Sequence, residues 1–177
     1  IKSYHTEDYS IFEHFISIYN QTMQRDNAEE YYYFQEEFYK AIHDYLKGNY
    51  QVFYATLDDQ IIAVSIILYA NKQMHYHLSG SLSEYRSFAP TNLLLYEVAL
   101  WGHQEGYKTF HLGGGLGSGN DNLYKFKAAF NRKSGLQFSI GKQIFNQALY
   151  NQLVEERLAE DPNFDLEGKY FPLYRAK

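Results

Sequence analysis

Residues 50–79 read YQVFYATLDDQIIAVSIILYANKQMHYHLS and hold three apolar runs, which Asp58-Asp59 and Asn71-Lys72 separate. Both separators are pairs of residue types that favour turns. The spacing predicts an antiparallel meander whose strands are residues 50–57, 60–70 and 73–79. The middle run is apolar enough to be covered on both faces, so we expect it to be the central strand of a sheet.

Two helical patterns precede this meander. In residues 9–25 the apolar side chains recur at spacings of three and four, which predicts an amphipathic helix. A second helix is predicted from near Ala28 to Tyr45, and Gly48 ends it. The consecutive aromatics of residues 31–34 lie within it. Because neighbours on a helix point in different directions, we interpret them as core and interface packing rather than as a stacking platform for bases or sugars.

The order of elements after the meander defines the fold class. A helix that Thr91 can cap and Gly106 ends is followed by a short strand, a glycine-rich stretch and further elements. We expect strands over 108–112 and 137–145, helices over 121–131 and 147–159, and an irregular tail with Pro162 and Pro172. The result is an α/β fold, a mixed sheet with a central antiparallel meander and helices on both faces. A doubly wound nucleotide-binding fold is disfavoured because strands and helices do not alternate from the start.

Composition limits the possible classes of function. The 177 residues, 45% of them hydrophobic, suit one domain with a single core. The lack of cysteine excludes disulfides, thiolate catalysis and cysteine-ligated zinc. A net charge of −5 gives no electrostatic footprint for nucleic acid, so any RNA contact must be local or shared. No apolar run is long enough to span a membrane and no leader is visible, so we expect a soluble, cytoplasmic protein. Because the sequence starts at Ile1 and not at Met, we expect it to be part of a longer polypeptide.

Five local segments carry a family resemblance: 58–63, 75–81, 90–97, 107–115 and 123–130. Together with the order of elements, which is the GNAT layout, they resemble the FemAB-like peptidoglycan-bridge aminoacyltransferases of the GNAT superfamily. The layout implies a first strand at or before Ile1. The chain is most similar to the second of that family's two GNAT-like domains. The resemblance therefore implies that residues 1–177 are a single GNAT-like domain, the C-terminal half of a longer two-domain protein with an N-terminal companion domain.

The resemblance also implies an activity. Family members transfer amino acids from aminoacyl-tRNA to the side-chain amine of a peptidoglycan precursor, which builds the interpeptide bridges of the cell wall. It implies the same partners here, aminoacyl-tRNA and a muropeptide precursor, with no cofactor and with Phe126 and Lys127 at the reaction centre. The substrate-binding residues that it implies are Arg86, Asn92, His77, Gly113, Gly114, Gly115 and Tyr124. A homodimer is compatible with this reading.

Wider relatives use acyl-CoA, so two alternatives stay open. One is an acyl-CoA-dependent N-acyltransferase, using acetyl-CoA or another acyl-CoA, that acts on a sugar or peptide amine. The other is a non-catalytic GNAT-like binding module.

Lys127 follows the glycine-rich residues 113–119, and both features suit acyl transfer. An ammonium at this place can stabilise the tetrahedral oxyanion or contact the tRNA terminus. The glycines allow a ligand to approach the backbone and allow amides to point toward anions, although their spacing is not that of a Walker loop. The alternatives are a solvated lysine and a surface connection.

The stretch Arg86-Ser87-Phe88-Ala89-Pro90-Thr91 bears on the donor. GNAT enzymes bind the coenzyme A pyrophosphate through an Arg/Gln-x-x-Gly-x-Gly/Ala pattern at a helix N-terminus. Arg86 fits this pattern, but Ala89 and Thr91 replace the glycines, and Pro90 removes an amide donor. The sequence thus argues against ordinary acetyl-CoA binding, while an anion can still meet Arg86 and the helix end.

His75, His77 and His111, together with Glu97, form a candidate metal or acid/base cluster. Strand spacing places His75 and His77 on one face of the sheet. Nothing in the sequence orders a third metal ligand, so we predict no metal site. One histidine as general base for the amine and a hydrogen-bonded sheet residue are the remaining interpretations.

Overall fold

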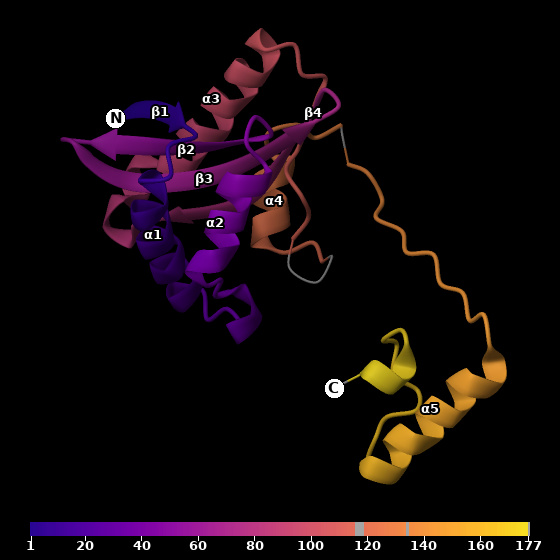
Figure 1. Cartoon of the computed structure of the whole chain (residues 1–177). Coiled ribbons are helices and arrows are strands. Elements are labelled where there is room, and N and C mark those ends of the chain that lie inside the picture. The colour runs from indigo at the N-terminus through magenta and orange to yellow at the C-terminus, as the bar shows by residue number, and fades with distance from the viewer. Residues whose placement is uncertain (116–118, 134, 177) are drawn as a thin grey trace. The chain divides into compact units, whose positions relative to one another are not determined.

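The structure is a computed structural model that describes residues 1–115, 119–133 and 135–176 (Figure 1). It divides into two compact units, Ile1–Arg132 and Lys133–Lys177. We expected one core for the whole chain. Both clusters of buried apolar side chains lie in the first unit instead. None of the helices in the described ranges has the length and apolar character needed to span a bilayer.

The first unit is built on a five-stranded sheet in the order β1-β2-β3-β4-β5. Its strands are β1 (Lys2–Thr6), β2 (Tyr50–Leu57), β3 (Gln60–Ala70), β4 (Gln73–Ser81) and β5 (Thr109–His111). The predicted meander is confirmed, with β3 at the centre and antiparallel to both neighbours. β5 pairs with β4 in parallel. The expectation of a first strand at or before Ile1 is wrong, because β1 begins at Lys2 and pairs with β2.

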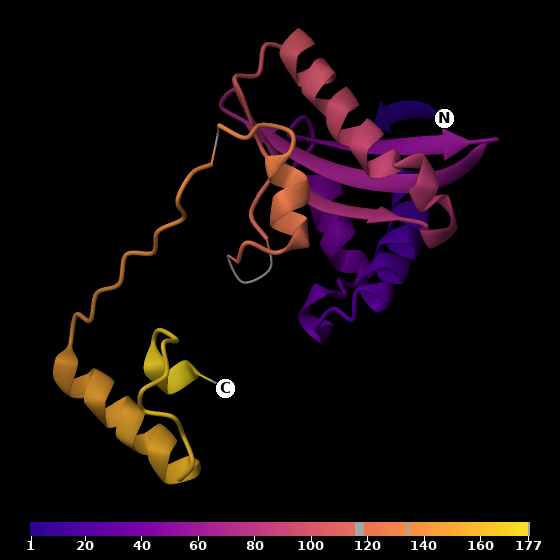
Figure 2. The ribbon, with the colours of Figure 1, turned by 180° about the vertical axis from the view of Figure 1, so that it is seen from behind.

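Helices cover both faces of this sheet, as predicted (Figures 1 and 2). On one face, α1 (Ile11–Arg25) and α2 (Glu36–Tyr45) form a core with β2 and β3, in which Phe15 and Tyr39 are fully buried. On the other face, α3 (Pro90–Gln104) packs Leu94 and Val98 against the sheet. β3 faces a helix layer on each side, which explains why its sequence is apolar on both faces.

One glycine sets the approach of α1 to the sheet. A Cβ atom at Gly80 of β4 would lie 2.9 Å from the carbonyl oxygen of Ile18 and 2.9 Å from the Cα of Tyr19, both in α1. No side chain fits at this distance from backbone atoms. Gly80 therefore allows α1 to lie directly on β4, the strand that carries the candidate site.

The second predicted helix starts later than expected. Residues Glu30–Tyr32 form a short 3-10 helix, and α2 begins only at Glu36. An unbroken helix would have spread the aromatics of residues 31–34 around its circumference. The break instead lets Phe34 stack on Phe38 at 4.2 Å between ring centroids, while Tyr31 stays exposed.

Two further helix starts follow from local chemistry. α3 begins at Pro90, whose fixed φ suits the first helical turn, and its N-cap is Ala89 rather than the predicted Thr91. α4 (Asn122–Ala128) is shorter than the predicted 121–131. The side chain of Asp121 caps it by accepting a hydrogen bond from the Tyr124 amide at 2.7 Å.

The second unit contains α5 (Gln147–Glu160) and a short 3-10 helix, Leu173–Arg175. α5 confirms the helix predicted over 147–159, and the Asn146 side chain caps it. The strand predicted over 137–145 is wrong: these residues form no strand, and Phe138 and Phe145 are exposed. Alternating apolar residues form a strand only when a neighbouring strand supplies hydrogen-bond partners, and the structure describes none for this segment.

Candidate active site

The candidate site lies where β4 and β5 part. The two strands pair only from Gln73 opposite Thr109 to His75 opposite His111. Beyond that point β4 continues to Ser81, whereas β5 ends and the chain turns at Gly113 with φ +75°. The chain then returns in α4, which carries Lys127.

Lys127 reaches back from α4 to the end of β5. Its Nζ donates a hydrogen bond to the carbonyl oxygen of Gly114 at 2.9 Å and lies 5.7 Å from the ring centroid of Tyr76 in β4. Burial lowers the pKa of the Lys127 ammonium, and Asp121 opposes this shift. The half-buried ammonium is thus held by a carbonyl group and a ring face, and no described carboxylate forms an ion pair with it.

Two histidines meet across the β4–β5 pair. His75 Nδ1 and His111 Nδ1 are 3.0 Å apart, and the rings stack with centroids 5.2 Å apart at 20°. Burial lowers the pKa of His75, and the nearby His111, His77 and Lys127 lower it further. Lys127 is therefore close enough to act electrostatically on His75.

His77 lies on the same strand as His75, at a bulge in β4. Ile66 pairs with Leu78 and Ile67 with Tyr76, so His77 is the extra residue. Its ring lies 6.0 Å from that of His75, as the strand spacing predicted, and burial lowers its pKa. The four side chains Lys127, His75, His77 and His111 form what we call the basic cluster.

A row of rings extends from the basic cluster to the helical layer, and all of them except the buried Tyr19 are partly exposed. The ring of His77 lies 6.3 Å from that of Phe38, which stacks on Phe34, and Phe34 is 6.1 Å from Tyr19. Phe38 and Tyr76 were not predicted as neighbours of the site. The only signal for Tyr76 is its place between the two histidines of one strand.

The remaining predicted residues of the reaction centre lie around α4. Phe126 packs edge-on against Phe130 at 5.6 Å and makes no ring contact with the basic cluster. The Tyr124 side chain is 37% exposed. Gly115 is tightly enclosed, because a Cβ atom there would collide with the Asp121 carboxylate and the Gly119 carbonyl group. Of the predicted glycine loop, residues 116–118 lie outside the described residues.

Arg86 and Asn92 lie on either side of the N-terminus of α3, which begins at Pro90. Both are exposed, and the Arg86 side chain has no hydrogen-bond or ion-pair partner among the described residues. Ala89 adopts the left-handed conformation, with φ +49°, at the place where the GNAT pattern has a glycine. The backbone thus keeps a glycine-like turn, but Pro90 offers no amide hydrogen to an anion.

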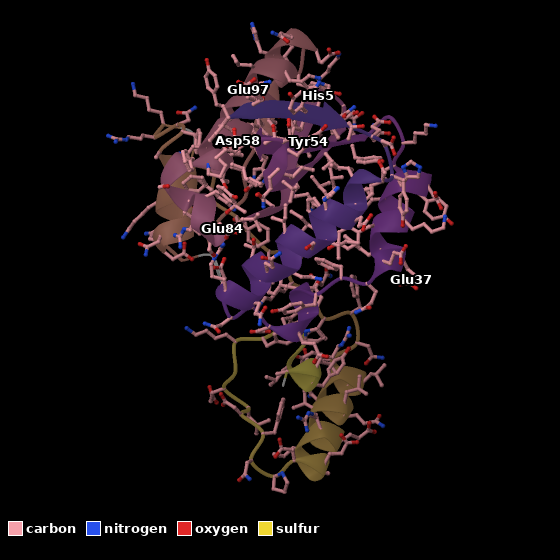
Figure 3. All side chains as sticks on the ribbon, turned by 90° about the vertical axis from the view of Figure 1, so that its left-hand side faces the viewer. His5, Glu37, Tyr54, Asp58, Glu84 and Glu97 are labelled. Atoms are coloured by element: carbon pink, nitrogen blue, oxygen red, sulfur yellow. The ribbon has the colours of Figure 1, made fainter. Side chains whose placement is uncertain are left out.

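The predicted acid/base or metal cluster is assembled only in part. The three histidines come together, whereas Glu97 lies on α3 (Figure 3), and no hydrogen bond, ion pair or ring contact joins Glu97 to them among the described residues. Within the described ranges, no three His, Asp or Glu side chains are placed to hold a metal ion. The candidate chemistry therefore rests on a lysine and a histidine pair.

Comparisons with known proteins agree with this fold. The sequence profile described as "Acetyltransferase (GNAT) domain" matches residues 5–128. An aminoglycoside acetyltransferase from an uncultured soil metagenomic sample, in complex with sisomicin, is similar in structure, with a TM-score of 0.60 and 12% identity over 82% of this chain and 96% of that chain. A ribosomal-protein-alanine N-acetyltransferase from Brucella melitensis biovar Abortus 2308 has a TM-score of 0.56 and 10% identity, over 82% and 100%.

FemX is also similar in structure, with a TM-score of 0.58 and 14% identity. The match covers 72% of this chain and 48% of the FemX chain. No curated protein sequence matched. The sheet of five strands, the helices on both faces and the profile match over most of the chain lead to one conclusion: the chain belongs to the GNAT acetyltransferase domain family and is a GNAT-type acyltransferase.

Proposed function

We propose that this domain transfers an aminoacyl group from aminoacyl-tRNA to an amine of a peptidoglycan precursor, in the formation of cell-wall interpeptide bridges. The observation that carries the proposal is the Lys127 ammonium held 2.9 Å from the Gly114 carbonyl oxygen at the opening between β4 and β5. This N–H donor of Lys127 thus points to Gly114, where the glycine-rich backbone leaves the sheet.

The chemistry of N-acyl transfer suits this arrangement. An amine attacks the acyl carbon, and negative charge develops on the former carbonyl oxygen. An ammonium has three N–H donors, and the Gly114 carbonyl accepts only one of them. The other donors of Lys127 can bind the oxyanion. No covalent enzyme intermediate is required, in agreement with the lack of cysteine.

The connection before α3 favours aminoacyl-tRNA over acyl-CoA. A pyrophosphate cradle needs successive free amides at a helix N-terminus, and Pro90 removes one of them. The exposed Arg86 remains available for a phosphate of the tRNA end. The likeness to FemX supports the same choice at the level of the fold.

Acyl-CoA as donor is the second candidate. The left-handed conformation of Ala89 favours it, because this residue keeps the backbone shape that the family's glycine provides. The structural likeness to two acetyltransferases points the same way. On this alternative the acceptor would be a sugar or peptide amine.

The proposal includes partners beyond the described chain. A precursor acceptor and a charged tRNA are large, and the chain matches about half the length of FemX. We therefore propose a companion domain that completes the acceptor site, and a cytoplasmic location, where charged tRNA is found. Because that domain is needed to complete the acceptor site, the test uses the full-length parent protein.

The test is a transfer assay with the full-length parent. One arm supplies charged tRNA and a lipid-linked or nucleotide-linked muropeptide, and the other supplies acetyl-CoA with the same acceptor. Transfer from charged tRNA alone is the expected result. Turnover of acetyl-CoA alone would replace the donor with acyl-CoA. Binding of both substrates without turnover of either donor would identify a non-catalytic binding module.

A further inference from the structure

We propose that the pair of His75 and His111 is the proton acceptor of the acyl transfer, with His111 taking the proton from the acceptor's ammonium group and His75 positioning His111. The inference rests on the N-acyl transfer assigned above, but not on the identity of the donor. An amine must lose a proton before it can attack an ester or a thioester alike. At neutral pH an alkyl amine, with a pKa of about 10.4, is almost entirely protonated.

The geometry carries the proposal. The two Nδ1 atoms are 3.0 Å apart, so one of them carries a hydrogen and the other accepts it. When His111 Nδ1 is the donor, His111 Nε2 has a free lone pair. His111 is exposed and His75 is half-buried, so the open nitrogen belongs to the member of the pair that a substrate can reach.

The surroundings favour this direction of the hydrogen bond. Burial disfavours the charged form of His75, and the groups that face it are His77 on the same strand, His111 on β5 and Lys127 on α4, all of them basic. A neutral His75 keeps Nδ1 as an acceptor. Its partner His111 can then become an imidazolium whose Nδ1–H remains hydrogen-bonded to His75.

The proton balance of the step is complete. The ammonium gives one proton to His111 Nε2, and the nitrogen lone pair forms the C–N bond while charge moves to the carbonyl oxygen beside Lys127. Collapse breaks the C–O bond of an ester, or the C–S bond of a thioester. A second proton from the nitrogen passes to the leaving oxygen or sulfur. The products are the amide, the free hydroxyl or thiol, and the protonated histidine, which loses its proton to solvent.

The experiment measures the pH dependence of kcat/KM in the full-length parent for His111→Ala. We expect a loss of about 100-fold near neutral pH, the lower range for a general base. The loss should shrink as the pH rises toward 9, because more of the acceptor is then already deprotonated. His103→Asn is the matched control, since His103 is exposed at the end of α3, and it should keep the wild-type profile.

His75 is tested with two substitutions of different chemistry. The side-chain oxygen of His75→Asn can still accept from His111 Nδ1, whereas His75→Leu cannot. We expect His75→Asn to keep most of the activity and His75→Leu to lose about ten-fold or more. Equal losses in the two variants, or a loss in His111→Ala that is the same at every pH, would overturn the proposal.

A measurement without turnover completes the test. In an NMR titration of the histidine rings, His111→Ala should raise the pKa of His75, because a neighbour that lowers it is removed. An unchanged His75 titration would show that the two rings do not form a pair. A parent that uses neither donor would refute the proposed function, whereas an active parent whose His111→Ala variant keeps the wild-type pH profile would refute only the proton assignment.

Discussion

Lys127 Nζ donates a hydrogen bond to the carbonyl oxygen of Gly114 across 13 positions of the sequence, and this bond ties α4 to the end of β5. The same ammonium lies over the ring of Tyr76. One side chain thus connects the three elements that border the candidate site.

Lys127→Ala should abolish most transfer activity while the fold persists. The variant loses the donors proposed for the oxyanion, and removal of one such donor costs about 100-fold to 1,000-fold in kcat. Lys125→Ala is the matched control, because Lys125 is an exposed lysine of the same helix. A steady-state assay of kcat decides the matter. Equal rates for wild type and Lys127→Ala would remove Lys127 from the reaction.

Gly113→Ala should damage the site through the backbone. Gly113 has φ +75°, and an added Cβ would lie 3.4 Å from Lys127 Nζ. We expect a loss of about 1 kcal/mol in the free energy of unfolding and a lower kcat. The comparison is Gly114→Ala, where an added Cβ meets no atom within 4 Å, and whose loss of stability should be smaller. Urea unfolding of both variants measures this difference.

Gly80→Ala should weaken the packing of α1 on β4. The new Cβ would press on the backbone of Ile18 and Tyr19, and overpacking of this kind costs about 1–3 kcal/mol. Gly141→Ala, at an open position of the second unit, is the control. Equal melting temperatures of Gly80→Ala and wild type would show that the helix can shift without cost.

Acid should destabilise the fold through the buried histidines. Burial lowers the pKa of His75 and of His77 below the ordinary value of 6.5. Between the folded pKa and 6.5 the unfolded chain therefore binds more protons than the folded chain, and the free energy of unfolding falls as the pH falls. The double variant His75→Gln/His77→Gln should gain stability relative to wild type as the pH is lowered from about 7.5 to about 5. Urea midpoints across this range test the sign, and a constant difference would contradict it.

Arg86→Ala should weaken donor binding more than it slows chemistry. Arg86 is exposed and precedes the N-terminus of α3, which suits its proposed contact with a phosphate. We expect a higher KM for charged tRNA and a salt dependence of binding whose logarithmic slope falls by about one. Arg132→Ala serves as the control for loss of an exposed arginine elsewhere. An unchanged KM together with a lower kcat would place Arg86 in the reaction instead.

Most of the sheet and the helices of the first unit could be predicted because their patterns are local. The runs that form β2, β3 and β4 and the spacing in α1 show which face of each element is buried. The helix break before Glu36 could not be predicted, because the apolar spacing of residues 31–45 fits an unbroken helix equally well. The strand prediction over 137–145 was wrong because a strand needs a neighbouring strand as hydrogen-bond partner, and the sequence of the segment does not show whether one is present.

The candidate site was predictable in its residue types but not in its assembly. Lys127, the glycines and the three histidines stand out in the sequence. Only the parallel pairing of β5 with β4 brings His111 to His75, 36 positions apart. Phe126 is the neighbour of Lys127 in α4, but its ring packs on Phe130 and not on the histidines.

The sequence by itself determined the meander, the helical layers and the lack of cysteine chemistry, because hydrophobic periodicity and composition act locally along the chain. The tertiary structure alone decided which groups meet at the opening between β4 and β5. Contacts between residues distant in sequence depend on strand order, register and the close approach that Gly80 allows, and none of these leaves a local signal. Burial of His75 at this opening, together with its neighbours His111, His77 and Lys127, lowers its pKa and keeps it neutral, as the proposed reaction requires.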